Sequence, residues 1–377
     1  MDPERLKTSF ARVAAHGDEV AYFFYSHLFL GHPELRGMFP VSMTGQRDRL
    51  LSALGRIVSE AADTDRLVPF LQGLGRDHRK FGTIAAHYPA VGESLLATLA
   101  YFSGRDWTPD LAREWTEAYT LIAQVMSESA TADERDDQPA WWDAVVIGHE
   151  RRTLDVSVLR VAPQRHLPFV PGQSVAIECH QRPRVWRYYS PANAPREDGT
   201  IDFHVRLVDG GTVSPALART AGVGTRLRLG SPVGTLRLDV GSRNDVLLAA
   251  GSTGLAPLKS IAEHAAMMPS PPRVHVVFGA RTGADLYDLA AIQKLAARWP
   301  WLTVTAVTSH DPRFPGEQGT VADAVARRFL AARQDAARQD AYVCGSPAMV
   351  EATAGRLEQL GTPRAQIFTE DFGGSGE

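Results

Sequence analysis

A single histidine, His78, stands among charged residues in the stretch L-Q-G-L-G-R-D-H-R-K-F-G (71–82). The apolar spacing predicts a helix over 66–81, on which one stripe is formed, at steps of four and three, by Leu67, Leu71, Leu74, His78 and Phe81. A histidine on an apolar stripe is usually a core residue with satisfied hydrogen bonds, and less often a ligand to a metal. The neighbouring segments have to decide between these two interpretations.

Two nearby helical segments predict an apolar pocket for His78. The segment 21–39 carries Tyr25 and leads into a turn with Phe39. The next helical segment has, on one side, Gln46, Leu50, Leu54 and Ile57. A flat apolar cofactor needs aliphatic and aromatic walls, one axial imidazole and few polar groups opposite it. The three segments together provide such a set of side chains.

A glycine-rich turn, A-G-S-T-G-L-A-P (250–257), joins a predicted buried strand to a helix. Glycines let the backbone come close to a pyrophosphate, and the start of a helix attracts negative charge. The spacing differs from the dinucleotide pattern G-x-G-x-x-G, so a plain tight turn is the alternative. Its position after the first strand of a predicted parallel sheet favours a nucleotide.

The stretch R-Y-Y-S (187–190) ends another predicted strand, and D-G-G-T-V-S-P (209–215) follows it. An arginine can bind a phosphate, an aromatic ring can cover a flat heterocycle, and a capped helix start can take a pyrophosphate. We predict Ser214 as the helix cap and Pro215 as the first helical residue. Taken alone, R-Y-Y-S favours a strand with exposed aromatic side chains.

Segments of three different patterns must position these residues. Residues 1–130 predict an all-α domain, followed by a linker over 131–141, with helices at 18–30, 46–61, 66–81, 90–102 and 109–127. Residues 142–241 predict an antiparallel β-barrel domain, with alternating strands at 153–161, 173–179, 201–208 and 225–229. Residues 242–377 predict an α/β doubly wound domain, with buried strands at 245–250, 273–278, 302–307 and 340–344. Its helices are expected at 255–267, 286–298, 320–333 and 347–360.

The composition excludes several classes of protein. A chain of 377 residues is too long for one average core, and a net charge of −3 argues against a nucleic acid or an anionic membrane as partner. The two cysteines, Cys179 and Cys344, are too few for a disulfide framework and suit a reducing compartment. The sequence shows neither a signal core nor an apolar run of membrane-spanning length. We therefore expect a soluble, cytoplasmic protein with no membrane span.

Six motifs occur in one order along residues 142–374: P-G-Q (171–173), R-Y-Y-S, G-G-T-V-S (210–214), A-G-S-T-G-L-A-P, Y-V-C-G-S-P (342–347) and E-D-F-G-G (370–374). This ordered set resembles the ferredoxin–NADP reductase superfamily, which implies an FAD domain followed by an NAD(P)H domain. The FAD contacts that the resemblance implies are Arg187, Tyr188, Tyr189, Ser190, Arg206, Gly211, Thr212, Val213, Ser214 and Phe372. The implied NAD(P)H contacts are Gly251, Ser252, Thr253, Gly254, Arg281, Cys344, Gly345 and Pro347.

The resemblance also implies individual roles. Arg187 is expected at the FAD pyrophosphate, Tyr189 against the isoalloxazine and Ser190 near its N5. Phe372 is expected to shield the other flavin face. Cys344 is expected near the hydride path, although a buried cysteine is often an inert core residue.

Five further motifs carry a second resemblance: F-Y-S-H-L-F, P-E-L-R-G-M-F, G-Q-R, D-H-R-K-F and H-Y-P-A-V-G-E-S-L-L-A-T-L. Over residues 1–130 they resemble the globin domain of flavohemoglobins. The resemblance implies that His78 is the proximal ligand of the heme iron and that Tyr25 and Gln46 form a distal hydrogen-bonding pair. Tyr88 is expected to orient the imidazole. The implied heme-pocket walls are Phe39, Leu50, Leu54 and Phe81.

The two resemblances together imply a nitric oxide dioxygenase with heme b, FAD and NADH or NADPH. Electrons from NAD(P)H would pass through FAD to the heme, where O₂ and nitric oxide become nitrate. Two alternatives stay open: a flavoheme reductase with weak nitric oxide activity acting on another acceptor or a hydroxy acid, and a sensor globin that gates the reductase. The coenzyme is also open, because Arg281 follows the second sheet strand where a 2′-phosphate could bind, while the family widely uses NADH.

One position departs from the resemblance. Flavohemoglobins that oxidise nitric oxide efficiently place a glutamate on the last globin helix, and the aligned residue here is Ala130. Glu128 lies two residues away, about 200° around a helix, so we expect it to face elsewhere. An imidazole without a carboxylate partner donates less electron density to iron.

Overall fold

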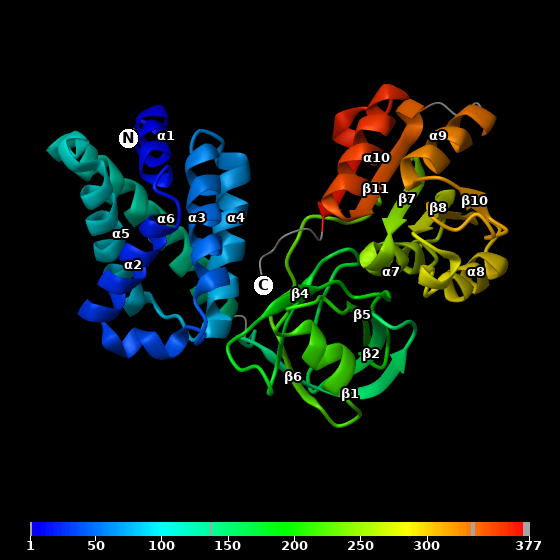
Figure 1. Cartoon of the computed structure of the whole chain (residues 1–377), viewed down its shortest axis with the longest axis horizontal. Coiled ribbons are helices and arrows are strands. Elements are labelled where there is room, and N and C mark those ends of the chain that lie inside the picture. The colour runs from blue at the N-terminus through cyan, green and yellow to red at the C-terminus, as the bar shows by residue number, and fades with distance from the viewer. Residues whose placement is uncertain (1, 136–137, 333–335, 372–377) are drawn as a thin grey trace. The chain divides into compact units, whose positions relative to one another are not determined.

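The computed structural model describes residues 2–135, 138–332 and 336–371, and it divides into two compact units. The first unit is the helical part up to Trp141, together with Pro183–Val185, and the second begins at Trp142. Figure 1 labels most of the elements. Among the described residues, none of the helices combines the length and the apolar character needed to cross a membrane.

The first unit contains the helices α1 (Pro3–Ala14), α2 (Asp18–Gly31), α3 (Thr44–Ser59), α4 (Thr64–His78), α5 (Tyr88–Ser103) and α6 (Pro109–Arg135). Their starts follow local chemistry: the Asp2 side chain caps α1 by accepting from the Glu4 amide at 3.0 Å, and Asp63 caps α4 through the Arg66 amide at 3.3 Å. The predicted all-α architecture of this part is confirmed.

Two helix ends differ from the prediction. α4 ends at His78 instead of continuing to 81, because residues Arg79–Phe81 tighten into a 3₁₀ turn and Gly82 follows with a left-handed φ of +78°. α6 runs to Arg135, so residues 131–135, which were assigned to the linker, are helical.

A close crossing fixes α4 on α6. A Cβ atom added to Gly75 of α4 would lie 2.2 Å from the backbone oxygen of Met126 in α6. Only a glycine permits this approach, which holds the helix of His78 at a set position.

The β part of the second unit is one antiparallel, nearly closed six-stranded barrel in the order β4-β3-β6-β1-β2-β5. Its strands are β1 (Trp142–Arg151), β2 (Val156–Pro163), β3 (Val175–Cys179), β4 (Arg187–Tyr189), β5 (Ile201–Arg206) and β6 (Arg226–Leu229). Alternating burial, as in β6, explains the sequence pattern, and the predicted barrel is confirmed.

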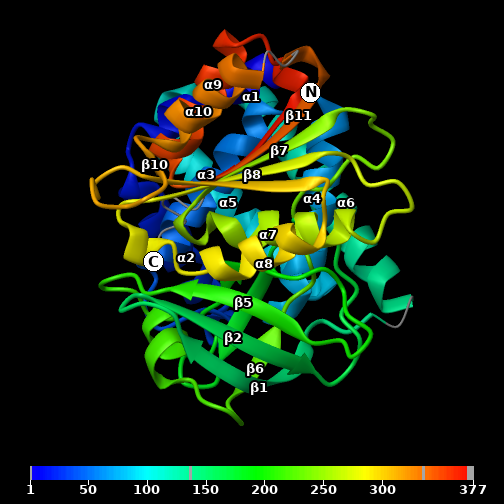
Figure 2. The ribbon, with the colours of Figure 1, turned by 90° about the vertical axis from the view of Figure 1, so that its right-hand side faces the viewer.

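The α/β part is a parallel sheet in the order β10-β9-β8-β7-β11-β12. Its strands are β7 (Asp245–Gly251), β8 (Val274–Ala280), β9 (Leu302–Thr308), β10 (Glu317–Gln318), β11 (Gln339–Gly345) and β12 (Ile367–Asp371). Its helices are α7 (Leu255–Ala265), α8 (Leu289–Arg298), α9 (Val321–Ala332) and α10 (Pro347–Gln359). Figure 2 shows α7 and α8 on one face and α9 and α10 on the other, each pair with its own apolar core. The predicted doubly wound sheet is confirmed.

Candidate functional site

His78 ends α4 with one ring nitrogen fixed and the other open. Its Nδ1 lies 2.7 Å from the backbone oxygen of Leu74, one turn earlier, so Nδ1 carries the proton that it donates. Nε2 makes no hydrogen bond to any residue that the structure describes. Burial lowers the pKa of His78, against the opposing charge of Asp77, so the ring is a neutral imidazole with an available Nε2 lone pair.

The four side chains predicted as apolar walls of the site are all only partly buried. Phe39, Leu50 and Leu54 are partly buried and pack against the core of the helical unit. The Phe81 ring lies edge-on, 6.1 Å from the His78 ring. An open imidazole nitrogen and partly buried apolar side chains in the same helical unit are the donor and the lining that heme requires. The residues therefore fit a heme.

Tyr25 of α2 is a buried phenol among aromatic rings. Its ring centroid lies 5.6 Å from that of Phe39, and burial raises the pKa of its hydroxyl to about 12, so it stays a proton donor at neutral pH. The hydroxyl lies 3.4 Å from the backbone oxygen of Gln46, while the Gln46 side-chain oxygen accepts from Arg49 at 3.0 Å. The structure thus makes Tyr25 and Gln46 neighbours, and their action as a side-chain pair stays a prediction.

Tyr88 opens α5 and is anchored through its backbone. Its carbonyl oxygen accepts from the Tyr119 hydroxyl at 2.6 Å, and burial raises the pKa of Tyr88. Within the described part of the chain, the Tyr88 hydroxyl makes no hydrogen bond. Its orienting role toward His78 stays a prediction.

The end of α6 offers no carboxylate at the position aligned with the glutamate of flavohemoglobins. Ala130 is partly buried, and the exposed Glu128 accepts from Gln124 at 2.8 Å. The residue between them, Ser129, is buried and donates to the Gln72 backbone oxygen at 2.7 Å.

The sequence did not reveal a buried ion pair beside His78. The side chains of Asp77 and Lys80, which lie three positions apart in the sequence, form a salt bridge. Both residues are less than 10% exposed. Burial lowers the pKa of Lys80 despite its partner. The three-residue spacing of opposite charges was the available signal, but charges beside a helix usually face solvent.

The R-Y-Y-S stretch forms β4, an edge strand of the barrel. Arg187 is half-buried and donates to its neighbour Trp186 at 3.0 Å, Tyr188 is 45% exposed, and Tyr189 is half-buried. Ser190 is buried, with its Oγ 3.1 Å from that of Ser174. An edge strand with accessible aromatic rings leaves room for a flat heterocycle, so these residues fit an FAD ring.

The segment expected at the FAD pyrophosphate takes a different local form. Ser214 does not cap the helix: it is itself helical, its Oγ accepts from the Val208 amide at 3.1 Å, and the chain continues into the π-helical turn Ala216–Thr220. The Thr212 carbonyl accepts from Arg182 at 3.2 Å, next to Gly211 and the buried Val213. Arg206 is exposed and pairs with Asp155 at 3.3 Å. Phe372 lies outside the described residues.

The nucleotide loop lies where the order of the parallel sheet reverses, between β7 and β11. It runs from Gly251 through the turn Ser252–Gly254, including Thr253, to the start of α7. A Cβ atom on Gly254 would lie 2.2 Å from the backbone oxygen of Cys344, so this loop touches the end of β11. Ligands of open α/β sheets bind at this kind of crevice.

The other predicted nucleotide contacts surround that crevice or lie one strand away. Gly345 ends β11 and Pro347 begins α10. Arg281 is exposed after β8, and its carbonyl accepts from the His310 amide at 2.8 Å. Burial raises the pKa of the Cys344 thiol far above its usual value, so it is no thiolate nucleophile.

A polar cluster joins β4 (Arg187–Tyr189), called the flavin strand because the flavin is expected beside it, to the nucleotide crevice. Glu370 of β12 pairs in register with Cys344, and its Oε1 accepts from the Ser174 hydroxyl at 2.9 Å. Its buried Oε2 has no hydrogen-bond partner among the described residues, and burial raises the pKa of Glu370. The sequence assigned no role to Ser174 or Glu370, although Glu370 begins the E-D-F-G-G motif.

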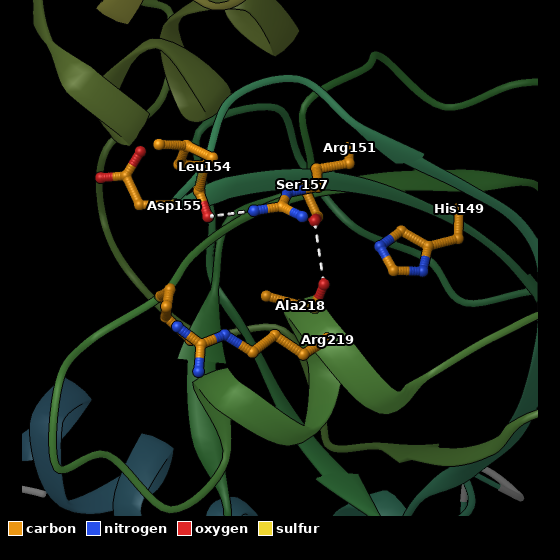
Figure 3. A pocket seen from close by; sticks show the side chains of 8 residues that line it. His149, Arg151, Leu154, Asp155, Ser157, Ala218 and Arg219 are labelled. Carbon is orange, nitrogen blue, oxygen red and sulfur yellow. Dashed lines mark hydrogen bonds between the residues drawn. The ribbon is translucent and has the colours of Figure 1, made fainter.

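A separate cavity of about 350 Å³ lies at the barrel end near the β1–β2 turn (Figure 3). The cavity is lined by His149, Arg151, Leu154, Asp155, Ser157, Leu207, Ala218 and Arg219. None of the predicted cofactor contacts lines it. Arg151 is occupied by the hairpin itself, donating to the Thr153 and Leu154 carbonyls at 3.0 and 3.1 Å. The cavity therefore lies outside the predicted sites.

Comparison with known proteins agrees with the three-part fold. Three family models match in succession: globin over residues 22–126, the oxidoreductase FAD-binding domain over 143–238, and the oxidoreductase NAD-binding domain over 247–355. The flavohemoprotein of Bacillus subtilis (strain 168) is 25% identical over 391 residues, covering 98% of this chain and 96% of that protein.

Two further proteins are similar to this chain, one over its reductase half and one over the whole fold. The ferredoxin–NAD(P)⁺ reductase component of the naphthalene 1,2-dioxygenase system of Pseudomonas putida is 34% identical over 257 residues, 67% of this chain and 75% of that protein. The crystal structure of flavohemoglobin from Malassezia yamatoensis, with bound FAD and heme, has a TM-score of 0.82 at 18% identity and covers 98% of both chains. A globin that holds heme is here fused to a reductase that holds FAD and a nicotinamide nucleotide, and the chain belongs to the flavohemoglobin family.

Proposed function

We propose that this oxidoreductase is a nitric oxide dioxygenase, which converts nitric oxide and O₂ to nitrate with electrons from NAD(P)H. The observation that carries the proposal is the open Nε2 of His78 in the same helical unit as the buried, protonated phenol of Tyr25. Both Tyr25 and Lys80, two residues after His78, feel the charge of Arg49 on α3. Tyr25 and the turn after His78 therefore both lie near α3.

The helical unit supplies three functions in this proposal. His78 would hold the heme iron through Nε2, while its Nδ1–H bond to Leu74 fixes the ring orientation. Bound heme supplies O₂ binding and one-electron chemistry. Tyr25 would donate a hydrogen bond to a polar diatomic ligand, as a preorganised donor that needs no reorientation. The apolar walls would keep water away from that ligand.

The reductase unit would bind and orient the electron donor. Ser190 and the rings of β4 would hold the flavin, and the loop Ser252–Gly254 would hold the nicotinamide nucleotide at the sheet crevice. Bound FAD divides a two-electron supply into single electrons. Ser174 would link the flavin end to the crevice, since its hydroxyl bonds to both Ser190 and Glu370, and burial raises the pKa of Glu370.

A second function remains a candidate because of one observation at His78. The only described group bonded to Nδ1 is the neutral carbonyl of Leu74, and no described carboxylate reaches this nitrogen. A carboxylate would make the imidazole a stronger electron donor, which favours cleavage of the oxygen–oxygen bond. Its absence favours a flavoheme reductase that acts mainly on another acceptor.

Nitric oxide consumption with nitrate analysis tests the proposal. The chain should form one nitrate per nitric oxide and consume one NAD(P)H per two nitric oxide molecules, since each dioxygenation needs one electron. NAD(P)H oxidation that is indifferent to nitric oxide and gives no nitrate would support the other reductase instead. Ala130→Glu should raise nitric oxide turnover about tenfold, and Ala130→Gln, of the same size but neutral, should not.

A further inference from the structure

The segment directly after the flavin strand is held by one face of α7. This segment, residues 192–194, begins two positions after Ser190 and is fully or nearly fully buried. Three consecutive backbone groups there bond to α7 side chains. Lys259 donates to the Ala192 oxygen at 3.2 Å, and Ser260 donates to the Asn193 oxygen at 2.7 Å. The Ala194 amide donates to Glu263 at 3.0 Å.

Lys259 and Glu263 form an ion pair, and Ser260 holds the same segment beside them. The Lys259 ammonium lies 3.3 Å from Glu263 and 4.0 Å from the buried Asp288, and its side chain is only 12% exposed. Ser260 is fully buried. A buried ammonium between two carboxylates is costly to remove, so the group has one preferred arrangement.

On the barrel side, the held segment is itself rigid. The Asn193 side chain accepts from the Asp202 amide at 2.6 Å and donates to the Ala194 and Thr200 carbonyls at 2.7 and 3.2 Å. The Ala192 amide donates to the Asp202 oxygen at 2.7 Å. Residues 192–194 are therefore fixed to the start of β5, in the same barrel as β4.

On the other side, α7 is continuous with the nucleotide loop. Gly254 immediately precedes α7, and Lys259 is its fifth residue. The flavin strand and the nucleotide loop are thus joined by a short path. It runs over two residues from Ser190 to Ala192, across the hydrogen bonds to the α7 side chains, and along about one and a half turns of α7.

We propose that Lys259, Ser260 and Glu263 are positioning residues for electron entry, which set the nicotinamide ring against the flavin. In that step the C4–H bond of NAD(P)H breaks, the hydride with its two electrons bonds to flavin N5, and NAD(P)⁺ and reduced flavin result. Rates of such transfers fall steeply when the reacting atoms shift by about 1 Å. The proposal rests on the reductase half and does not require nitric oxide to be the substrate.

The test compares Lys259→Met and Ser260→Ala with Lys294→Met, an exposed lysine on α8 of the same sheet. Each full-length holoprotein is mixed anaerobically with NADH while flavin reduction is followed. In Lys259→Met the limiting rate of flavin reduction should fall about 10–100-fold, with a smaller loss in Ser260→Ala and none in Lys294→Met. The NADH concentration for half-maximal rate should change less than about twofold, because the loop that holds the nucleotide is intact.

Two readouts separate positioning from general damage. Amide hydrogen exchange in residues 191–195 should speed up in both α7 variants, because the Ala194 amide and its neighbours lose their anchor. Heme reduction after photochemical reduction of the flavin should keep its wild-type rate, since that step does not use the nucleotide loop. Glu263→Gln keeps an acceptor for the Ala194 amide and should retain more activity than Glu263→Ala.

The proposal is overturned if Ser260→Ala and Lys259→Met show faster exchange at 191–195 but reduce flavin at the wild-type rate. It is equally overturned if the loss appears only in the half-maximal NADH concentration. Failure of nitric oxide oxidation in all proteins would contradict the proposed function and leave this result unaffected.

Discussion

At the scale of single residues, His78 and Tyr25 show how burial prepares two rings for opposite tasks. Burial lowers the pKa of His78, which frees a lone pair, and raises the pKa of Tyr25 to about 12, which keeps a proton. In the proposed function, the His78 lone pair would bind the heme iron, and the Tyr25 hydroxyl would donate a hydrogen bond to the ligand of that iron. Neither state needs a charged partner inside the pocket.

Replacing Tyr25 by phenylalanine removes the distal donor and little else. Its present bond to the Gln46 carbonyl is long, at 3.4 Å, so the free energy of unfolding should change by less than about 1 kcal/mol. Oxygen should dissociate from the reduced protein about tenfold faster, which flash photolysis measures. Tyr22→Phe, on the same helix but 53% exposed, is the control. Equal dissociation rates in both variants would remove Tyr25 from the distal role.

The sequence predicted His78 as a candidate because a helical stripe identifies the face on which a residue lies. It could not predict that Asp77 and Lys80 are buried, since this depends on what packs around the turn after α4. Ser174 was missed for a similar reason: its bond to Glu370 joins residues 196 positions apart. Periodicity reports neighbours along one element and says nothing of partners from another.

At the scale of elements, the crossing of α4 and α6 determines where His78 is held. The backbone of Met126 occupies the space above Gly75, so that no side chain fits between the helices. The position of α4 is therefore fixed by backbone contact and does not depend on adjustable side chains.

Gly75→Ala should force the two helices apart. The obstructing atom belongs to the backbone, so the free energy of unfolding of the helical unit should fall by about 1–3 kcal/mol, and heme should be lost more readily. Gly73→Ala, on the same helix with nothing within 4 Å of the added Cβ, should instead raise it by about 0.5–1 kcal/mol. Chemical denaturation of both variants measures these changes. A Gly75→Ala protein as stable as Gly73→Ala would contradict the crossing.

Elements with a regular hydrophobic period were predicted well, whereas their ends were not. β7 and β8 are buried on both faces and were recognised as continuous apolar runs. α6 exceeded its predicted end because its last turns, up to Arg135, are polar and resemble a linker in composition. The Ser214 cap failed because the Val208 amide, brought there by the chain turn, competes for its hydroxyl.

At the scale of the whole molecule, buried histidines make the reductase unit sensitive to acid. Burial lowers the pKa of His275, whose ring nitrogens lie 2.6 and 3.0 Å from Thr303 and Thr305, to about 3. Burial likewise lowers the pKa of His204 to about 3. The unfolded chain takes up these protons near pH 6.5 and the folded chain does not, so stability is lost as pH falls from about 6.5 towards 3.

His275→Gln should reduce this loss. Glutamine can still donate to and accept from the two threonines but does not titrate. Between pH 7 and pH 5, the wild-type free energy of unfolding should fall by roughly 1–2 kcal/mol more than that of the variant. Urea unfolding followed by flavin fluorescence at both pH values measures the difference. The exposed His180→Gln should behave as wild type, and a wild-type pH response in His275→Gln would contradict the account.

In the proposed electron path, His78 binds a heme that the reductase half of the same chain reduces. An anaerobic absorption spectrum, taken before and after NADH and then after carbon monoxide, tests it most directly. Wild-type protein should show a heme Soret band with flavin absorption, NADH should reduce both, and carbon monoxide should shift the Soret band. His78→Ala should lose the heme band and keep the flavin. A flavin spectrum without heme in wild-type protein made with ample heme, or an unchanged heme spectrum in His78→Ala, would contradict the claim.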